Sequence, residues 1–166
     1  MESPLAGLHF TEDLVADLQS CGVGVVFITL HSVGSWLPFL EDEVESHEMH
    51  AEWFSVPEET ATEINLALSR GSRVVACGST SLRAIESAAG DNGHVTAQSG
   101  RTKLYASPGY RFKTISGYFT NFHQQRSSLM VLDSAFAGRD LVLRAYEYAA
   151  DHQYGFYEFG DAVFYK

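Results

Sequence analysis

Apolar and polar positions alternate along the chain in patterns that predict helices and strands in turn. Thr11 followed by Glu12 and Asp13 is typical of a helix start, and the apolar residues that come next recur on one face. Comparable patterns predict four more helices, and glycine marks the end of several of them. We expect helices over residues 12–20, 58–70, 78–90, 127–137 and 139–151.

Short apolar runs lie between these helices. The run VGVVFITLH, residues 23–31, is apolar almost throughout and rich in β-branched residues, which is typical of a strand covered on both faces. RVVAC at residues 73–77 has the same character. Further strands are expected at residues 51–56, 101–106 and 111–119, and loops at residues 32–50 and 91–100.

This order of elements predicts the fold class. Helices that alternate with apolar strands indicate an α/β fold, with helices flanking a mixed, largely parallel central sheet. The chain has 166 residues, enough to bury the core of one domain, and the sequence contains no internal repeat or linker. We therefore expect a single α/β domain over residues 1–166.

The formal net charge of −10 narrows the range of partners. Tight binding to nucleic acid depends on neutralising phosphates with Lys and Arg, so the chain as a whole would repel RNA. A nucleic-acid role would need a local basic patch, such as Arg101, Lys103, Arg111 and Lys113. No stretch has the length of a membrane span or the layout of a signal peptide, so we expect a cytoplasmic protein with no membrane partner.

A candidate anion site lies where a predicted strand turns through Gly78 into a helix. The first amides of a helix have no intrahelical partner, and the hydroxyls of Thr80 and Ser81 add donors. Arg83 follows on the first turns and could bind a carboxylate or a phosphate. The alternative is a plain helix cap with a surface ion pair between Arg83 and Glu86, which are three residues apart.

The segment HEMHAEW, residues 47–53, suggests a metal site at first sight. Metalloprotease helices carry His residues four apart, whereas His47 and His50 are three apart and no further ligand follows, so we expect no metal. If the segment is a strand, His50 and Glu52 point to the same side and form a workable acid–base pair. A solvated loop is the alternative.

Five segments together resemble a known family. In order and spacing they are similar to the C-terminal half of the S-adenosylmethionine:tRNA ribosyltransferase-isomerases of queuosine biosynthesis, over nearly the whole chain. The segments are PLAGLHFTEDL, HEMHAEWFSVP, VVACGSTSLRAIESAAG, PGYRFKTISGYFTNFH and SAFAGRDLVLRAYEYA with YGFYEFGDAVF. The chain starts about halfway along the family pattern, so we expect a fragment or a shortened relative without the N-terminal part and the inserted β-barrel domain.

The resemblance implies an activity and its substrates. Members of the family transfer and isomerise the ribosyl group of S-adenosylmethionine onto 7-aminomethyl-7-deazaguanine at the tRNA wobble position. The product is epoxyqueuosine, and adenine and methionine are released. S-adenosylmethionine is therefore the implied ribosyl donor and tRNA the implied partner, bound weakly by this chain alone. A second chain that supplies the missing half is a further expected partner.

The resemblance also implies a site made of loops. Asn121 and His123 would lie on a ligand-facing loop after a strand, and the alternative is a histidine that is satisfied over the core. The chain departs from the family at HSVGSWLPF, where the family has HVGxGTF, and at TNFHQQ, which lacks the usual proline. The expected catalytic residues are His50, Glu52 and His123. The expected substrate-binding residues are His9, Gly34, Ser35, Gly78, Thr80, Ser81, Arg83 and Asn121.

Two other functions stay open on the sequence alone. A shortened, inactive relative could act as a ligand-binding or assembly module, which the acidity and the missing half both favour. Another S-adenosylmethionine enzyme, such as a methyltransferase, is disfavoured because the chain has no Gly-rich dinucleotide-type loop.

Overall fold

A computed structural model of the chain describes residues 5–32, 43–157 and 159–166. The helices are η1 (Leu5–His9), α1 (Glu12–Ser20), η2 (Val44–Ser46), α2 (Glu58–Ser69), α3 (Ser79–Ala88), α4 (Ser128–Ala137) and α5 (Arg139–Asp151), where η marks a 3₁₀ helix. The strands are β1 (Thr29–His31), β2 (Glu52–Val56), β3 (Val75–Cys77), β4 (Gln98–Thr102), β5 (Gly117–Asn121) and β6 (Ala162–Tyr165).

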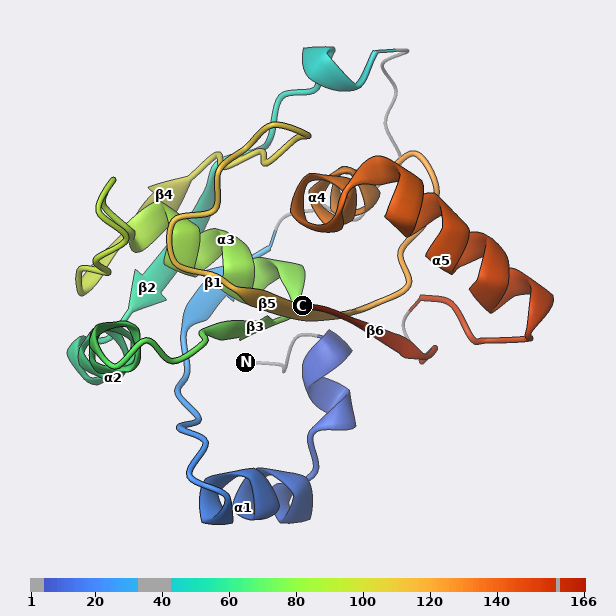
Figure 1. Cartoon of the computed structure of the whole chain (residues 1–166). Helices are drawn as coiled ribbons and strands as arrows, with labels where there is room; N and C mark the ends of the chain where they lie inside the picture. The colour runs from blue at the N-terminus through green and yellow to red at the C-terminus, as the bar shows by residue number, and fades with distance from the viewer. Residues whose placement is uncertain (1–4, 33–42, 158) are drawn as a thin grey trace.

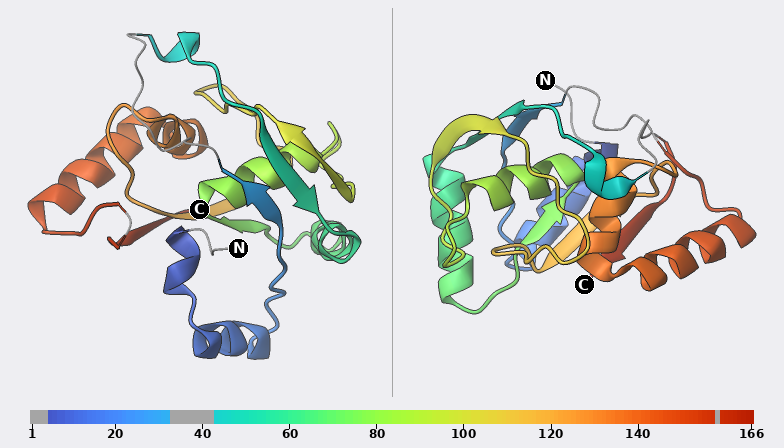
Figure 2. Two further views of the ribbon diagram at one scale, coloured as in Figure 1. Left: turned by 180° about the vertical axis from the view of Figure 1, so that it is seen from behind. Right: turned by 90° about the horizontal axis from the view of Figure 1, so that it is seen from above.

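The strands form two small sheets with α3 between them (Figure 1). In the first sheet, β1, β2 and β4 pair antiparallel. In the second sheet, β5 lies between a parallel neighbour, β3, and an antiparallel one, β6. The helices α3, α4 and α5 lie on one side of the second sheet, and η1 lies against β5 on the other (Figures 1 and 2).

The mixed α/β class with flanking helices is confirmed. The strands, however, divide between two sheets instead of forming one central sheet. Within the described residues β3 and β5 make the only parallel pair, so the sheets are less parallel than the sequence predicted.

The five predicted helices are confirmed to within two residues at each end, because their end signals are local. The Oγ1 of Thr11 accepts a hydrogen bond from the backbone N–H of Leu14 and caps α1. Ser127 caps α4 in the same way. Gly138, with a φ of 89°, ends α4 and starts α5, a backbone conformation that other residues rarely adopt.

The strand predicted over residues 23–31 is wrong for most of its length. Only Thr29–His31 pair with a neighbour, β2, and residues 23–28 form an extended connection from α1. This connection is not covered on both faces, since Phe27 is 75% exposed. An apolar run becomes a strand only where another element supplies a backbone ladder. Among the described residues no strand pairs with residues 23–28, although Val26 and Ile28 pack against the core.

The strands predicted at residues 101–106 and 111–119 are displaced along the chain, to β4 and β5. For β5 the reason is a side chain. The buried carboxylate of Glu86 accepts hydrogen bonds from the backbone N–H groups of Lys113, Thr114 and Ile115. These amides are therefore not available to a strand ladder, and β5 begins only at Gly117.

Candidate functional site

The carboxyl ends of the parallel strands β3 and β5 meet at one edge of the second sheet, where open α/β sheets commonly bind ligands. Gly78 joins β3 to α3 at this edge, and its backbone N–H donates to the carbonyl of Phe119 at 2.8 Å. Its φ of 87° favours glycine. Thr80 and Ser81, both half-buried, lie on the first turn of α3 beside it.

Asn121 ends β5 at the same edge and joins two other segments to it. Its Oδ1 lies 3.2 Å from Nε2 of His9, which comes from η1 on the other side of the sheet. Its Nδ2 donates to the carbonyl of Tyr157 at 2.9 Å. The structure thus brings His9 and Asn121 into contact, with Asn121 buried and His9 exposed.

His123 follows on the loop after β5, and its side chain is 11% exposed. Its backbone N–H donates to the hydroxyl of Tyr146 at 2.8 Å, and its Nε2 lies 3.0 Å from Oγ1 of Thr120. Burial lowers the pKa of His123 to about 4. The imidazole is therefore neutral at pH 7, and the Nδ1 atom has no hydrogen bond to any residue that the structure describes.

Arg83 and Glu52 form a buried ion pair between α3 and β2. The Nε of Arg83 donates to the carbonyl of Leu104 at 3.1 Å, and Ser32 donates to Oε1 of Glu52. The surface ion pair of Arg83 with Glu86 that we weighed as an alternative is therefore wrong, because each residue is buried and bonded elsewhere. The Nη2 of Arg83 is buried without a hydrogen-bond partner and lines a small cavity.

His50 does not share the surroundings of Glu52. β2 begins at Glu52, so His50 precedes the strand, and it is exposed while Glu52 is 1% exposed. The strand geometry that predicted a paired orientation therefore does not apply to His50. Gly34 and Ser35 lie outside the described residues.

Two general features concern the described residues only. No group of three or more His, Cys, Asp or Glu side chains in this part of the chain is arranged to hold a metal ion. None of its helices is long and apolar enough to cross a membrane.

Sequence reasoning missed a further buried carboxyl group, that of Asp133 in α4, beside His123. Its Oδ2 accepts hydrogen bonds from the hydroxyls of Tyr146 and Tyr165. A signal was present in the sequence: the helix SLMVLDSAFA is apolar except for small polar residues and this one acid. A single acid in such a helix indicates a buried charge with a specific set of partners.

Comparisons with known proteins agree with this architecture. The family profile described as "Queuosine biosynthesis protein" matches residues 1–165. The S-adenosylmethionine:tRNA ribosyltransferase-isomerase of Caldanaerobacter subterraneus subsp. tengcongensis is 45% identical over 97% of this chain and 48% of its own length. The enzyme of the same name from Macrococcus caseolyticus is 44% identical over 98% of this chain and 48% of its own.

A crystal structure of an S-adenosylmethionine tRNA ribosyltransferase from Thermotoga maritima has the same fold. It is 35% identical with a TM-score of 0.78, over 96% of this chain and 50% of that one. The chain thus spans about half the length of the curated relatives it matches. With a profile match over nearly its whole length, the chain belongs to the queuosine biosynthesis protein family.

Proposed function

We propose that this chain carries ligand-binding loops of an S-adenosylmethionine:tRNA ribosyltransferase-isomerase. The reaction moves the ribosyl group of S-adenosylmethionine onto 7-aminomethyl-7-deazaguanine at the tRNA wobble position and isomerises it to epoxyqueuosine. Adenine and methionine are released. The observation that carries the proposal is the 45% identity to an enzyme of that name, which extends over 97% of the chain.

The edge where β3 and β5 end supplies groups that suit this chemistry. The reaction needs a holder for the methionine carboxylate, a base for a proton beside the sulfonium, and groups that fix the ribose and the base. We assign the carboxylate to the start of α3, at Gly78, Thr80 and Ser81, where helix amides favour an anion. Of the three expected catalytic residues, His123 is the one that we place against the ligand, through its unused Nδ1.

Arg83 and Glu52 support this edge from one turn further along α3. Their mutual ion pair occupies most of their bonding capacity, which favours a role in holding α3 against β2. The buried Nη2 of Arg83 keeps its two N–H groups for an anion. His9, through Asn121, adds an exposed imidazole at the same edge.

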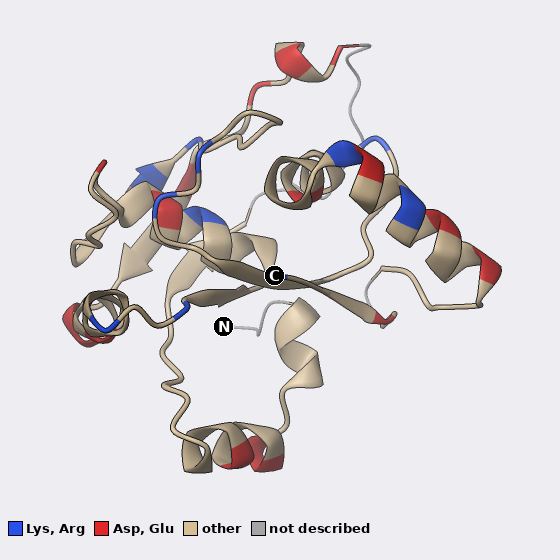
Figure 3. Ribbon diagram, in the orientation of Figure 1, with Lys and Arg blue, Asp and Glu red and all other residues tan. Residues whose placement is uncertain are grey.

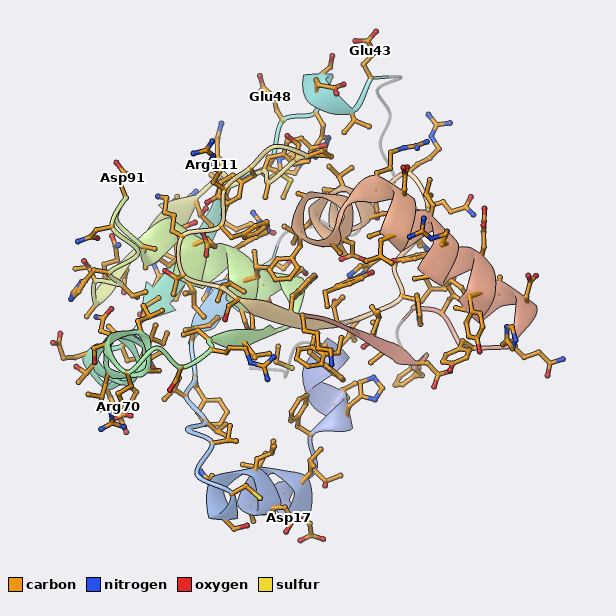
Figure 4. All side chains as sticks on the ribbon, viewed as in Figure 1. Asp17, Glu43, Glu48, Arg70, Asp91 and Arg111 are labelled. Carbon is orange, nitrogen blue, oxygen red and sulfur yellow. The ribbon has the colours of Figure 1, made fainter. Side chains whose placement is uncertain are left out.

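The charge distribution bears on tRNA as the partner. Asp and Glu residues lie on α1, α2, η2 and α5, and Lys and Arg residues lie near β4 and in the loop before β5, with others on α5 and by α2 (Figure 3). Arg111 in this loop points away from the molecule (Figure 4). Because phosphate neutralisation dominates RNA affinity, a protein with a net charge of −10 and one small basic region will bind tRNA weakly by itself.

The proposal includes the other half of the relatives' length, in the same polypeptide or in a second one, in the cytoplasm. Exposed apolar side chains near the N-terminal end of the described chain, Leu8, Val23 and Phe27 among them, favour contact with that half. A complete site would then form between the two halves.

Adenine release tests the proposed function. Purified chain is incubated with S-adenosylmethionine and precursor tRNA, alone and with the N-terminal half of the Caldanaerobacter relative, and adenine is quantified by chromatography. We expect little release from the chain alone and clear release from the mixture, lost on His123→Ala. An N-terminal half alone that releases as much adenine as the mixture would contradict the proposal.

A second candidate function is a ligand-binding or assembly module without turnover, which the net charge of −10 favours. Calorimetry separates the two. Binding of S-adenosylmethionine without adenine release, in the presence and absence of the second half, would support the module and exclude the enzyme.

A further inference from the structure

A buried carboxyl group lies directly behind the proposed ligand residue His123. Asp133 in α4 is 0% exposed. Its Oδ2 accepts hydrogen bonds from the hydroxyls of Tyr146, on α5, at 3.0 Å and Tyr165, on β6, at 3.3 Å. Its Oδ1 has no hydrogen-bond partner.

Two routes connect this carboxyl group to His123. The backbone N–H of His123 donates to the hydroxyl of Tyr146, which itself donates to Oδ2 of Asp133. The loop after β5 is thereby held at His123 by a chain that ends on Asp133. The second route is direct, since Oδ1 of Asp133 lies 3.7 Å from Nε2 of His123.

The ring nitrogen Nε2 therefore has two oxygen neighbours. Thr120 Oγ1 is at hydrogen-bond distance, 3.0 Å, and Asp133 Oδ1 is just beyond it. A small rotation of the ring exchanges one oxygen for the other. Both oxygens lie next to the same ring nitrogen, and this arrangement leaves Nδ1 for a ligand.

Among the residues that the structure describes, the other buried carboxylates are those of Glu52 and Glu86, and Asp133 differs from them. Glu52 is paired with the guanidinium of Arg83, and Glu86 is held by three backbone amides. A carboxyl group that served packing alone would be costly with one oxygen left unbonded. The unbonded oxygen of Asp133 faces a titratable group instead.

We propose that Asp133 is a positioning residue for His123, which it holds through Tyr146 and to which it offers Oδ1 as a second partner for Nε2. The inference rests on the proposed ligand role of His123. Neither α4 nor α5 carries an expected site residue. By this inference the two helices fix the orientation and the protonation of the His123 ring.

The titratable groups that face Asp133 are Tyr118 from β5, His123 from the following loop, Tyr146 from α5 and Tyr165 from β6. Burial raises the pKa of Asp133 to about 8, against hydrogen bonds that lower it. The pKa of His123 is lowered to about 4. Between these values the pair holds one proton, on Asp133, and the two groups titrate as a unit.

Nuclear magnetic resonance of the ¹⁵N-labelled histidine rings tests the inference on the whole chain without any need for turnover. The His123 signals are assigned with His123→Gln. In the wild type we expect two titration steps, near pH 4 and near pH 8. Asp133→Asn should remove the upper step and keep the lower one. Asp140→Asn, an exposed acid on α5, is the matched control and should behave as the wild type.

A single step in the wild type, or an upper step that survives Asp133→Asn, overturns the inference. If Asp133→Asn does not fold, Tyr146→Phe decides. This variant keeps the carboxyl group but frees the His123 amide, which should then shift and exchange faster with solvent, and an unchanged amide overturns the positioning role.

S-adenosylmethionine affinity, measured on the same proteins, tests the proposed function separately. Asp133→Asn and His123→Ala should each weaken binding by about tenfold, roughly one hydrogen bond to a charged group. If His123→Ala binds S-adenosylmethionine as tightly as the wild type, and the wild type shows the two titration steps, the ligand role of His123 fails and the pairing with Asp133 stands.

Discussion

Glu52 and Asp133 are two fully buried acids that the protein treats differently. Glu52 faces a cation, the guanidinium of Arg83, and receives a further hydrogen bond from Ser32. Asp133 faces hydroxyl groups and a neutral imidazole. Removal from water costs both carboxylates heavily, but only Glu52 is compensated by an opposite charge.

The comparison shows that two equally buried carboxyl groups have different partners and different roles. Glu52 forms an ion pair with Arg83 that ties β2 to α3. Asp133 has a raised pKa and holds a proton at neutral pH. The first arrangement suits support of the fold, and the second suits exchange of a proton next to a ligand.

The largest expected effect on stability comes from breaking the ion pair of Glu52 with Arg83. Glu52→Ala leaves the buried guanidinium of Arg83 without its counter-charge, and we expect the free energy of unfolding to fall by about 3–5 kcal/mol. Urea denaturation at pH 7 measures it. Asp140→Ala, which breaks the exposed pair with Arg139, should leave stability nearly unchanged. A loss no larger for Glu52→Ala than for Asp140→Ala would show that the pair does not support the fold.

The second largest effect is a change with pH in the stability that Asp133 contributes, and it distinguishes Asp133 from Glu52. The pKa of Asp133 is about 8 in the folded chain against an ordinary 3.8, so between these values the folded state keeps a proton that the unfolded state has released. Its contribution to stability therefore falls as pH rises toward 8 and is constant above that. Asp133→Asn removes this dependence.

We compare the free energy of unfolding of the variant and of the wild type at pH 6.5 and pH 8. Both values lie above the range in which the lowered pKa of His123 makes stability rise with pH. From pH 6.5 to pH 8 the free energy of unfolding of the wild type should fall by about 2 kcal/mol more than that of Asp133→Asn. Urea denaturation at both pH values gives the difference. A difference independent of pH would mean that Asp133 is ionised in the folded protein.

Sequence patterns predicted the helices well, since the signals that start and end a helix are local. Thr11, Ser127 and Gly138 act on residues within one turn. The strands were harder because their limits depend on distant groups. Glu86 removes three amides from the segment before β5, and the apolar residues 23–28 have no pairing strand in the described part of the chain.

The strand-to-helix pattern singled out Gly78, and the resemblance singled out Asn121 and His123. The structure brings these three residues to one sheet edge. The connections behind them could not be predicted. Asp133 reaches His123 across ten residues of sequence and through Tyr146 on another helix. Glu52 and Arg83 meet only because α3 packs between the two sheets. Such pairs depend on tertiary packing, for which sequence spacing gives no signal.

The smallest expected effect distinguishes the two tyrosines that bond Asp133. Tyr165→Phe removes one hydrogen bond of 3.3 Å and leaves Oδ2 bonded to Tyr146, so we expect a loss of about 0.5–1.5 kcal/mol at pH 7. Tyr146→Phe should cost more, because it also leaves the His123 amide without an acceptor. Since the Tyr165 hydrogen bond lowers the pKa of Asp133, its loss should move the upper titration step of His123 to higher pH. Denaturation and ring titration of both variants measure these effects. Equal losses for the two variants would show that the His123 amide does not depend on Tyr146, and the cluster would then stabilise the fold without positioning the ring.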